Sequence, residues 1–117
     1  MKKINKAIWL SYDLGIGGDY PGLYKWLDNH KAKECGNSIA FFRYSVESSQ
    51  LDKLKNIIFE DLDKSVTLRP GDRLYIVYRE TNVAGANVRG HFIFGHRRSN
   101  PWEGYGDNEK STTDIGE

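Results

Sequence analysis

The chain contains 117 residues, of which 38% are hydrophobic and 13% aromatic, and it carries a formal net charge of +1. This length excludes a second domain with its own core, and the single cysteine, Cys35, excludes an internal disulfide and a cysteine metal cluster. The charge excludes the dense basic surface of a dedicated DNA-binding protein, because the chain before the acidic segment 107–117 carries only +4. We predict a single domain over residues 1–106 and a disordered polar tail over residues 107–117.

The beginning of the chain does not have the pattern of a membrane-targeting segment. Its lysines are followed by an apolar run that stops at Ser11, which is too short for a secretory signal. No apolar segment is long enough to cross a bilayer, and the lone Cys35 suits a reducing compartment. We therefore expect a cytoplasmic protein without a membrane partner.

The first third of the chain predicts a strand, a loop and a helix. Residues 7–12 place apolar side chains on both faces of an extended segment, which indicates a central strand. A glycine-rich loop follows over residues 13–21, and Pro21 is suited to open a helix because its missing N–H donor is unused there. One apolar stripe of that helix has helical spacing: Leu23, Trp26, Leu27 and His30.

The rest of the chain predicts a strand, a helix and a hairpin. Residues 38–46 are β-branched and aromatic, as in a strand, and Ser48–Ser49 offers an N-cap for the next helix. The apolar face of this helix consists of Leu51, Leu54, Ile58 and Leu62, with Ile57 beside it. After a turn at residues 69–72, the strands 73–79 and 88–96 are joined by a short connection and are expected to pair antiparallel.

The predicted order of elements is therefore βαβαββ. Two helices that follow separate strands are expected to pack on the same face of one sheet. The fold class that fits this order is α+β: a ferredoxin-like sandwich with a four-stranded, mainly antiparallel sheet and two helices on one face.

Two acidic residues flank the glycine-rich loop. Asp13 ends the first strand, and Asp19 precedes the helix. Carboxylate oxygens are the ligands that Mg²⁺ prefers, so the pair Asp13 and Asp19 predicts a magnesium site. The alternative is structural, because glycine permits a tight turn and Asp19 is a suitable helix cap.

The last strand predicts a basic face on the sheet. Arg89, His91 and Arg97 alternate onto one side, and Phe92, Phe94 and His96 alternate onto the other. We expect the helices to cover the phenylalanine side and to leave Arg89, His91 and Arg97 exposed. Together with Arg43 and Tyr75 from other strands, they would contact nucleic acid through stacking and phosphate pairing. A homodimer interface is the alternative use of the same face.

The segment from Arg97 to Trp102 is a second candidate for binding. Paired arginines before a tryptophan suit an anionic partner, through ion pairing and ring stacking. The other interpretation is that Trp102 and Tyr105 fold back over a sheet edge.

Several short segments between residues 7 and 78 together resemble one family: Tyr12–Asp13 at the end of a strand, Leu23 and Leu27 on a helix, RYSVE at 43–47 and QLDKL at 50–54. The family comprises the smaller ferredoxin-like CRISPR-adaptation proteins and their toxin relatives of the virulence-associated protein D group. The resemblance implies dimers formed through the sheets. It also implies that Asp13 matches an aspartate tied, in some members, to metal-dependent phosphodiester cleavage.

Two functions are expected from these observations. The first is a small, dimeric nucleic-acid- or nucleotide-binding protein. In its catalytic form it is an Mg²⁺-dependent nuclease in which Asp13 is the catalytic metal ligand. Asp19 would then be a second ligand, and Arg43, Arg89 and Arg97 would hold phosphates. The alternative is a non-enzymatic module that binds a protein partner in a toxin–antitoxin or antiviral defence system, since Tyr, Trp and Arg are favoured at interfaces.

Overall fold

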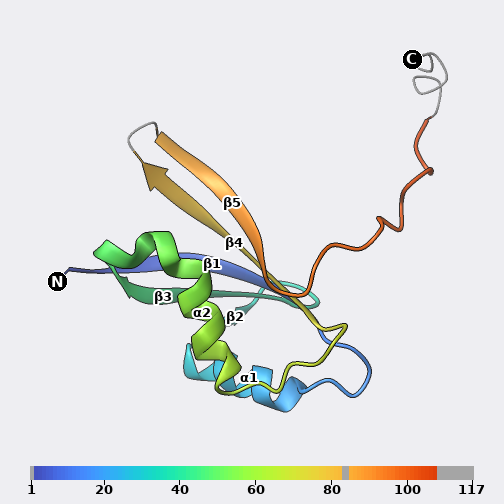
Figure 1. Ribbon diagram of the computed structural model, residues 1–117, viewed down its shortest axis with the longest axis horizontal. Helices are drawn as coiled ribbons and strands as arrows, with labels where there is room; N and C mark the ends of the chain where they lie inside the picture. The colour runs from blue at the N-terminus through green and yellow to red at the C-terminus, as the bar shows by residue number, and fades with distance from the viewer. Residues whose placement is uncertain (1, 83–84, 108–117) are drawn as a thin grey trace.

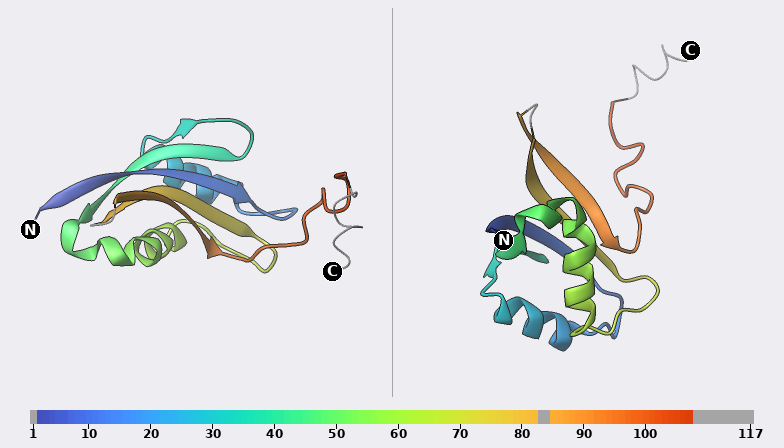
Figure 2. Two further views of the ribbon diagram at one scale, coloured as in Figure 1. Left: turned by 90° about the horizontal axis from the view of Figure 1, so that it is seen from above. Right: turned by 60° about the vertical axis from the view of Figure 1, so that its left-hand side comes forward.

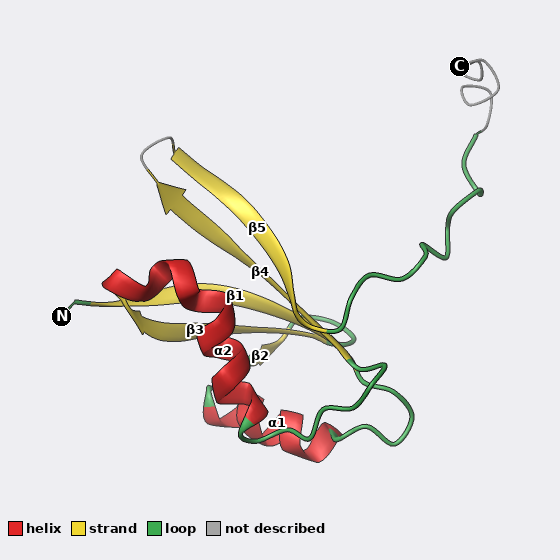
Figure 3. Ribbon diagram, in the orientation of Figure 1, coloured by secondary structure: helices red, strands yellow, loops and turns green. Residues whose placement is uncertain are grey.

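The computed structural model describes residues 2–82 and 85–107 (Figure 1). Its elements, in chain order, are β1 (Lys3–Asp13), α1 (Tyr20–Asn29), β2 (Lys33–Glu34), β3 (Ile39–Glu47), the 3₁₀ helix η1 (Ser48–Lys53), α2 (Leu54–Asp63), β4 (Arg73–Asn82) and β5 (Gly85–Phe94). They form an α+β arrangement of one antiparallel sheet and two α-helices (Figure 3). The tail predicted to be disordered lies, apart from Asp107, outside the described residues.

The sheet has five strands in the order β2-β3-β1-β4-β5, and each neighbouring pair is antiparallel. The prediction of four strands is therefore wrong, because it missed the short strand β2. In β2, Lys33 pairs with Phe41 and Glu34 pairs with Ala40 of β3. The two residues of β2 are both charged and show no apolar alternation, so the sequence pattern did not mark them as a strand.

Each helix connects strands that are not neighbours. The helix α1 joins β1 to β2 with β3 between them, and α2 joins β3 to β4 with β1 between them.

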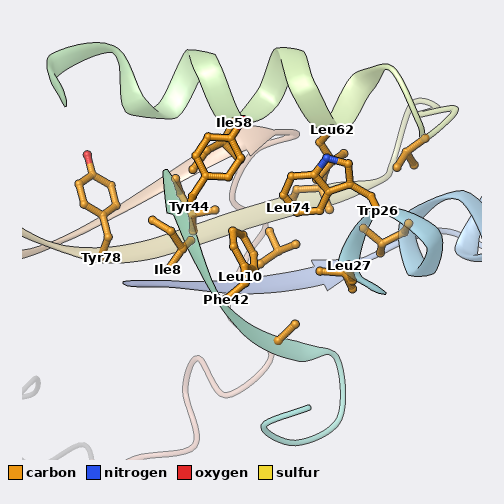
Figure 4. Close-up of a cluster of buried hydrophobic side chains, with 14 of the residues drawn as sticks. Ile8, Leu10, Trp26, Leu27, Phe42, Tyr44, Ile58, Leu62, Leu74 and Tyr78 are labelled. Carbon is orange, nitrogen blue, oxygen red and sulfur yellow. The ribbon is translucent and has the colours of Figure 1, made fainter. Parts of the chain in front are cut away.

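Both helices cover the same face of the sheet, as predicted. Alternate residues of the central strands point toward the helices and are buried: Ile8, Leu10, Phe42, Tyr44, Leu74 and Ile76. They form one cluster with Leu23, Trp26 and Leu27 of α1 and with Leu54, Ile58 and Leu62 of α2 (Figure 4). Burying each large apolar side chain contributes about 1.5–3 kcal/mol. The helical stripes read from the sequence are thus the ones that form the core.

The helix α2 begins later than its sequence pattern suggests. Residues Ser48–Lys53 form the 3₁₀ helix η1, with non-helical dihedral angles at Gln50, and regular α-helix starts at Leu54. No side-chain hydrogen bond caps the start of η1 or of α2, so the predicted cap at Ser48–Ser49 is not made. Leu51 still packs partly against the core from this first turn.

The β4–β5 hairpin extends beyond the rest of the sheet (Figure 1). The strand β1 pairs with β4 only from Ile8 to Asp13, whereas β4 and β5 pair as far as Asn82 and Gly85. A register shift between Leu74 and Tyr75 marks a bulge in the hairpin. A bulge changes which side chains of a strand share a face, so residues of β5 before the bulge lie on the opposite side from the one that strict alternation predicts.

Candidate nucleic-acid interface

The sheet face opposite the helices carries the residues that alternate with the buried ones. We call it the open face, and its residues include Trp9, Ser11, Ile39, Phe41, Arg43, Tyr75, Val77 and Phe92. Within residues 2–82 and 85–107 no helix lies against it, and Trp9 and Ile39 are 43% and 38% exposed. An uncovered sheet face with this many large rings is a candidate binding surface.

The rings of the open face form two similar units. In the first, Trp9 and Phe41 are cross-strand neighbours with ring centroids 4.9 Å apart, and the Arg43 guanidinium carbon lies 5.3 Å from the Phe41 centroid. We call Trp9, Phe41 and Arg43 the first aromatic–arginine unit. Both distances are within the range for aromatic pairing and cation–π contact.

The second aromatic–arginine unit consists of Tyr75, Phe92 and Arg97. The Tyr75 and Phe92 rings meet edge to face with centroids 4.7 Å apart, and the Arg97 guanidinium carbon lies 5.7 Å from the Phe92 centroid. A side chain at Gly90 would collide with the Tyr75 ring, so this glycine gives the ring its place beside the strand. Arg43, Tyr75 and Arg97 are therefore on the open face, where the sequence placed them.

Arg89 and His91 lie on the other side of the sheet, and their predicted exposure on the open face is wrong. Across the hairpin, Arg89 pairs with Tyr78 and His91 with Ile76, and both partners face the helices. Arg89 Nε donates a 2.6 Å hydrogen bond to Glu80 Oε1. The bulge between Leu74 and Tyr75 breaks the strict alternation, so Phe92 takes the open face instead, opposite Tyr75.

Asp13 lies at the rim of the open face, between two arginines. Its Oδ2 accepts hydrogen bonds from Arg73 Nη2 at 3.0 Å and from Arg98 Nη2 at 2.9 Å. The sequence analysis did not single out Arg73, and it considered Arg98 only as part of the segment after the last strand. The contacts with Asp13 were not predicted, because 60 and 85 residues separate Asp13 from Arg73 and Arg98, and no local pattern reports such contacts. Asp13 is thus paired with two cations, and its predicted catalytic role stays a prediction.

Asp19 is the N-cap of α1. Its Oδ1 accepts a hydrogen bond from Gly22 N at 3.0 Å, and its Oδ2 accepts one from Thr67 N at 2.8 Å. These backbone donors, Thr67 first and Gly22 second, lower the pKa of the Asp19 carboxyl because they stabilise its charged form. The structural alternative for Asp19 is therefore the one observed.

Asp13 and Asp19 do not fit a shared Mg²⁺ in this arrangement. Both Asp19 oxygens already accept backbone N–H groups, and Asp13 is paired with two cations. The described residues contain no group of three or more His, Cys, Asp or Glu side chains arranged to hold a metal ion. The magnesium site remains a prediction.

The glycine-rich loop is held in place by a buried carboxylate. Asp72 is 1% exposed, and its two oxygens accept hydrogen bonds from Gly15 N and Arg69 N, each at 2.8 Å. Arg69 Nη2 in turn donates to the Ile16 carbonyl oxygen at 2.8 Å. Buried charge is tolerated when hydrogen bonds satisfy it. The loop therefore fastens the end of β1 to the start of β4, which positions Asp13 beside Arg73.

A hollow joins the second aromatic–arginine unit to the paired charges at the rim. It measures about 280 Å³ and is lined by Ser11, Asp13, Arg73, Tyr75, Phe92 and Arg97. A second hollow continues from Arg73, Phe92 and Arg97 along the segment from Arg98 to Trp102. In that segment Trp102 is 68% exposed, so the described residues do not show it folded back over a sheet edge.

A hydrogen-bonded cluster on the helix-covered side contains His30. Asp61 Oδ2 accepts from Tyr44 Oη at 3.0 Å and from Trp26 Nε1 at 3.3 Å, and His30 Nε2 lies 3.4 Å away. Burial, followed by the contact with Asp61, raises the pKa of Tyr44 far above its ordinary value. This cluster joins α1, β3 and α2, and it places His30, the last residue of the predicted apolar stripe, in a packed position.

Comparison with known proteins adds no family to this geometry. The chain matches no protein-family model, and no curated protein or solved structure gives a significant match. Neither helix in the described ranges is long and apolar enough to span a membrane.

Proposed function

We propose that this protein binds single-stranded nucleic acid on the open face of its sheet. The observation that carries the proposal is that Phe41 and Phe92 each lie beneath an arginine guanidinium on the same uncovered surface. Bases stack on aromatic rings with about 1–3 kcal/mol each, whatever their sequence, and arginines pair with the phosphates between them. The exposed Trp9 and the Tyr75 ring enlarge the stacking surface.

The position of the two units favours a strand over a single base. The first unit is built on β3 and β1, and the second on β4 and β5. Neighbouring strands are about 4.8 Å apart, so the two units are separated by about two strand spacings, or roughly 10 Å. A short run of unpaired nucleotides can reach both, whereas base pairing would hide the ring faces and edges that such surfaces contact.

The arrangement of elements supports the predicted ferredoxin-like fold with one strand added. The order β1, α1, β2, β3, α2, β4 follows the β-α-β-β-α-β pattern of that fold, and β5 extends it. With both helices on one face, the other face is free for a ligand or for a second copy of the chain.

The predicted homodimer and the predicted nuclease activity remain proposals. Binding without cleavage is the function we favour, because Asp13 is paired with Arg73 and Arg98.

A protein-binding role is the second candidate, favoured by the exposure of Trp102 and Tyr105. These side chains are 68% and 86% exposed beyond the end of β5. Exposed aromatic residues beside arginines are frequent anchors in protein interfaces. This role would use the segment after β5, and removal of both rings by Trp102→Ala and Tyr105→Ala would leave binding to the open face intact.

The test measures the affinity for fluorescently labelled single-stranded RNA and DNA, with a duplex of the same sequence as the comparison. We expect salt-dependent binding of the single strands. Phe41→Ala and Phe92→Ala should each weaken it by about 1–3 kcal/mol. Tyr24→Ala is the matched control, since Tyr24 is an exposed ring on α1, away from the open face. Undetectable binding, or equal losses in Tyr24→Ala and Phe92→Ala, would refute the proposal.

A second arm of the same experiment examines cleavage. The labelled strands are incubated with Mg²⁺ and with either the wild-type protein or Asp13→Asn. Intact strands in every reaction are expected for a binding protein. Cleavage that is lost in Asp13→Asn would instead establish the predicted nuclease.

A further inference from the structure

The end of β1, the start of β4 and the segment that leaves β5 lie together at one end of the sheet (Figure 2). Four charged residues of these segments lie close to one another. They are Asp13, Arg73, Arg97 and Arg98, and we call them the rim cluster. Asp13 is opposite Arg73 in the β1–β4 register, and Leu74 is opposite Phe94, which brings the chain after β5 alongside. Gly95 has φ of +81°, and a side chain there would collide with Asp72 and Arg73, so only glycine lets this segment pass so closely.

We propose that the rim cluster binds the terminal phosphate of a nucleic-acid strand that occupies the open face. The inference rests on the proposed function and adds to it a preferred chemistry at the strand end. Three guanidinium groups and one carboxylate leave a net charge of +2 in the cluster. A phosphomonoester carries about −1.5 to −2 near pH 7, because its second pKa is about 6. A phosphodiester within the strand carries only one negative charge, so the terminal group complements the cluster better.

The arginines retain hydrogen-bond donors for such a group. A guanidinium has five N–H donors in a fork that matches phosphate oxygens. Arg73 and Arg98 each direct Nη2 to the same oxygen, Asp13 Oδ2. The Nε of Arg73 is buried and has no hydrogen-bond partner, which marks the cluster as incompletely satisfied. Arg98 is 60% exposed at the side-chain level and therefore accessible to a ligand.

The neighbouring rings place a base next to this phosphate. The hollow of about 280 Å³ contains Asp13 and Arg73 from the rim cluster together with Tyr75 and Phe92 from the second aromatic–arginine unit. Arg97 belongs to both groups, since it lies over Phe92 and lines the hollow. The terminal base would stack on Phe92 while its phosphate contacts the arginines.

Asp13 is a positioning residue in this arrangement. Its carboxylate holds Arg73 and Arg98 side by side, and without it their like charges would repel each other. Asp13→Asn should therefore have two opposite effects. General affinity for strands should rise slightly because one negative charge is lost, whereas the preference for a terminal phosphate should fall because the arginines separate. A merely structural role would lower both affinities together.

The experiment compares oligonucleotides of one sequence that end in a 5′-phosphate, a 3′-phosphate or hydroxyl groups only. The wild-type protein should bind one of the phosphorylated strands about tenfold more tightly, as expected for one or two added charge-assisted hydrogen bonds. Arg98→Ala should abolish this preference and leave binding of the hydroxyl-ended strand within about twofold. Arg89→Ala is the matched control, because Arg89 is paired with Glu80 on the helix-covered side and should change neither value. Circular dichroism of each variant verifies that it is folded.

The outcomes separate the inference from the function on which it rests. Equal affinity of the wild-type protein for all three strands would overturn the terminal-phosphate inference and leave strand binding established. Failure to bind any strand would overturn both. A preference that persists in Arg98→Ala and also in Asp13→Asn would place the phosphate elsewhere and would refute the rim cluster as its site.

Discussion

The two faces of the sheet are made from the same strands but from different kinds of side chain. On β3, Phe42 faces the helices and is 1% exposed, whereas its neighbours Phe41 and Arg43 face away. On β1, Ile8 and Leu10 are fully buried, and Trp9 between them is 43% exposed. The core is closed by one face alone, so the aromatic residues of the other face are not required for it. Their presence on an uncovered surface is better explained by binding than by folding.

The largest expected effect distinguishes the faces by stability. Phe42→Ala should destabilise the protein by about 3–5 kcal/mol, because it removes a ring from the closed core and leaves a cavity. Phe41→Ala, one residue earlier and on the open face, should cost about 1 kcal/mol or less. Urea unfolding monitored by circular dichroism measures both. Similar losses in the two variants would mean that the open face is also part of the folded core.

A smaller effect concerns the response of the helix-covered face to alkaline pH. The pKa of Tyr44 is raised in the folded protein, first by burial and then by Asp61, so the folded state retains this proton more strongly than the unfolded state does. The stabilisation from Tyr44 is therefore fully present below its unfolded pKa of about 10 and is lost as the pH rises further. Burial also raises the pKa of Tyr78 and Tyr12, in the same direction.

Tyr44→Phe isolates this contribution. The variant should be less stable than the wild type by about 1 kcal/mol at pH 7, because the hydrogen bond to Asp61 Oδ2 is lost. The difference should shrink between about pH 10 and pH 11.5, since the phenylalanine has no proton to lose. Unfolding curves at several pH values give the comparison, and a constant difference over this range would contradict the assigned cause.

Local patterns predicted those parts of the fold that depend on local physics. The stripe Leu23, Trp26 and Leu27 and the stripe Leu54, Ile58 and Leu62 are both buried, because helical spacing alone brings such residues onto one side. Residues 38–46 and 73–79 coincide closely with β3 and β4. Strand β2 was missed because its pairing depends on the adjacent β3 and on no apolar residue of its own.

The candidate site depended on contacts that a local pattern does not contain. One bulge in the β4–β5 hairpin exchanged the expected positions of Phe92 and His91, and it removed Arg89 from the open face. The bulge lies between the Leu74–Phe94 and Tyr75–Phe92 pairs, and no turn or breaker residue marks this position within the strand. The arginine partners of Asp13 come from distant parts of the chain, so an aspartate that suggested a metal ligand is found between two cations.

The indole N–H signals of two tryptophans, one on each face of the sheet, test most directly whether the open face binds single strands. Trp9 is on the open face, whereas Trp26 is 2% exposed beneath the helices, where its Nε1 donates to Asp61. In ¹⁵N-labelled protein titrated with a single-stranded oligonucleotide, binding on the open face predicts a large, saturable shift of the Trp9 signal and little change at Trp26. A shift at Trp26 with an unchanged Trp9, or no shift at either, would contradict binding on the open face.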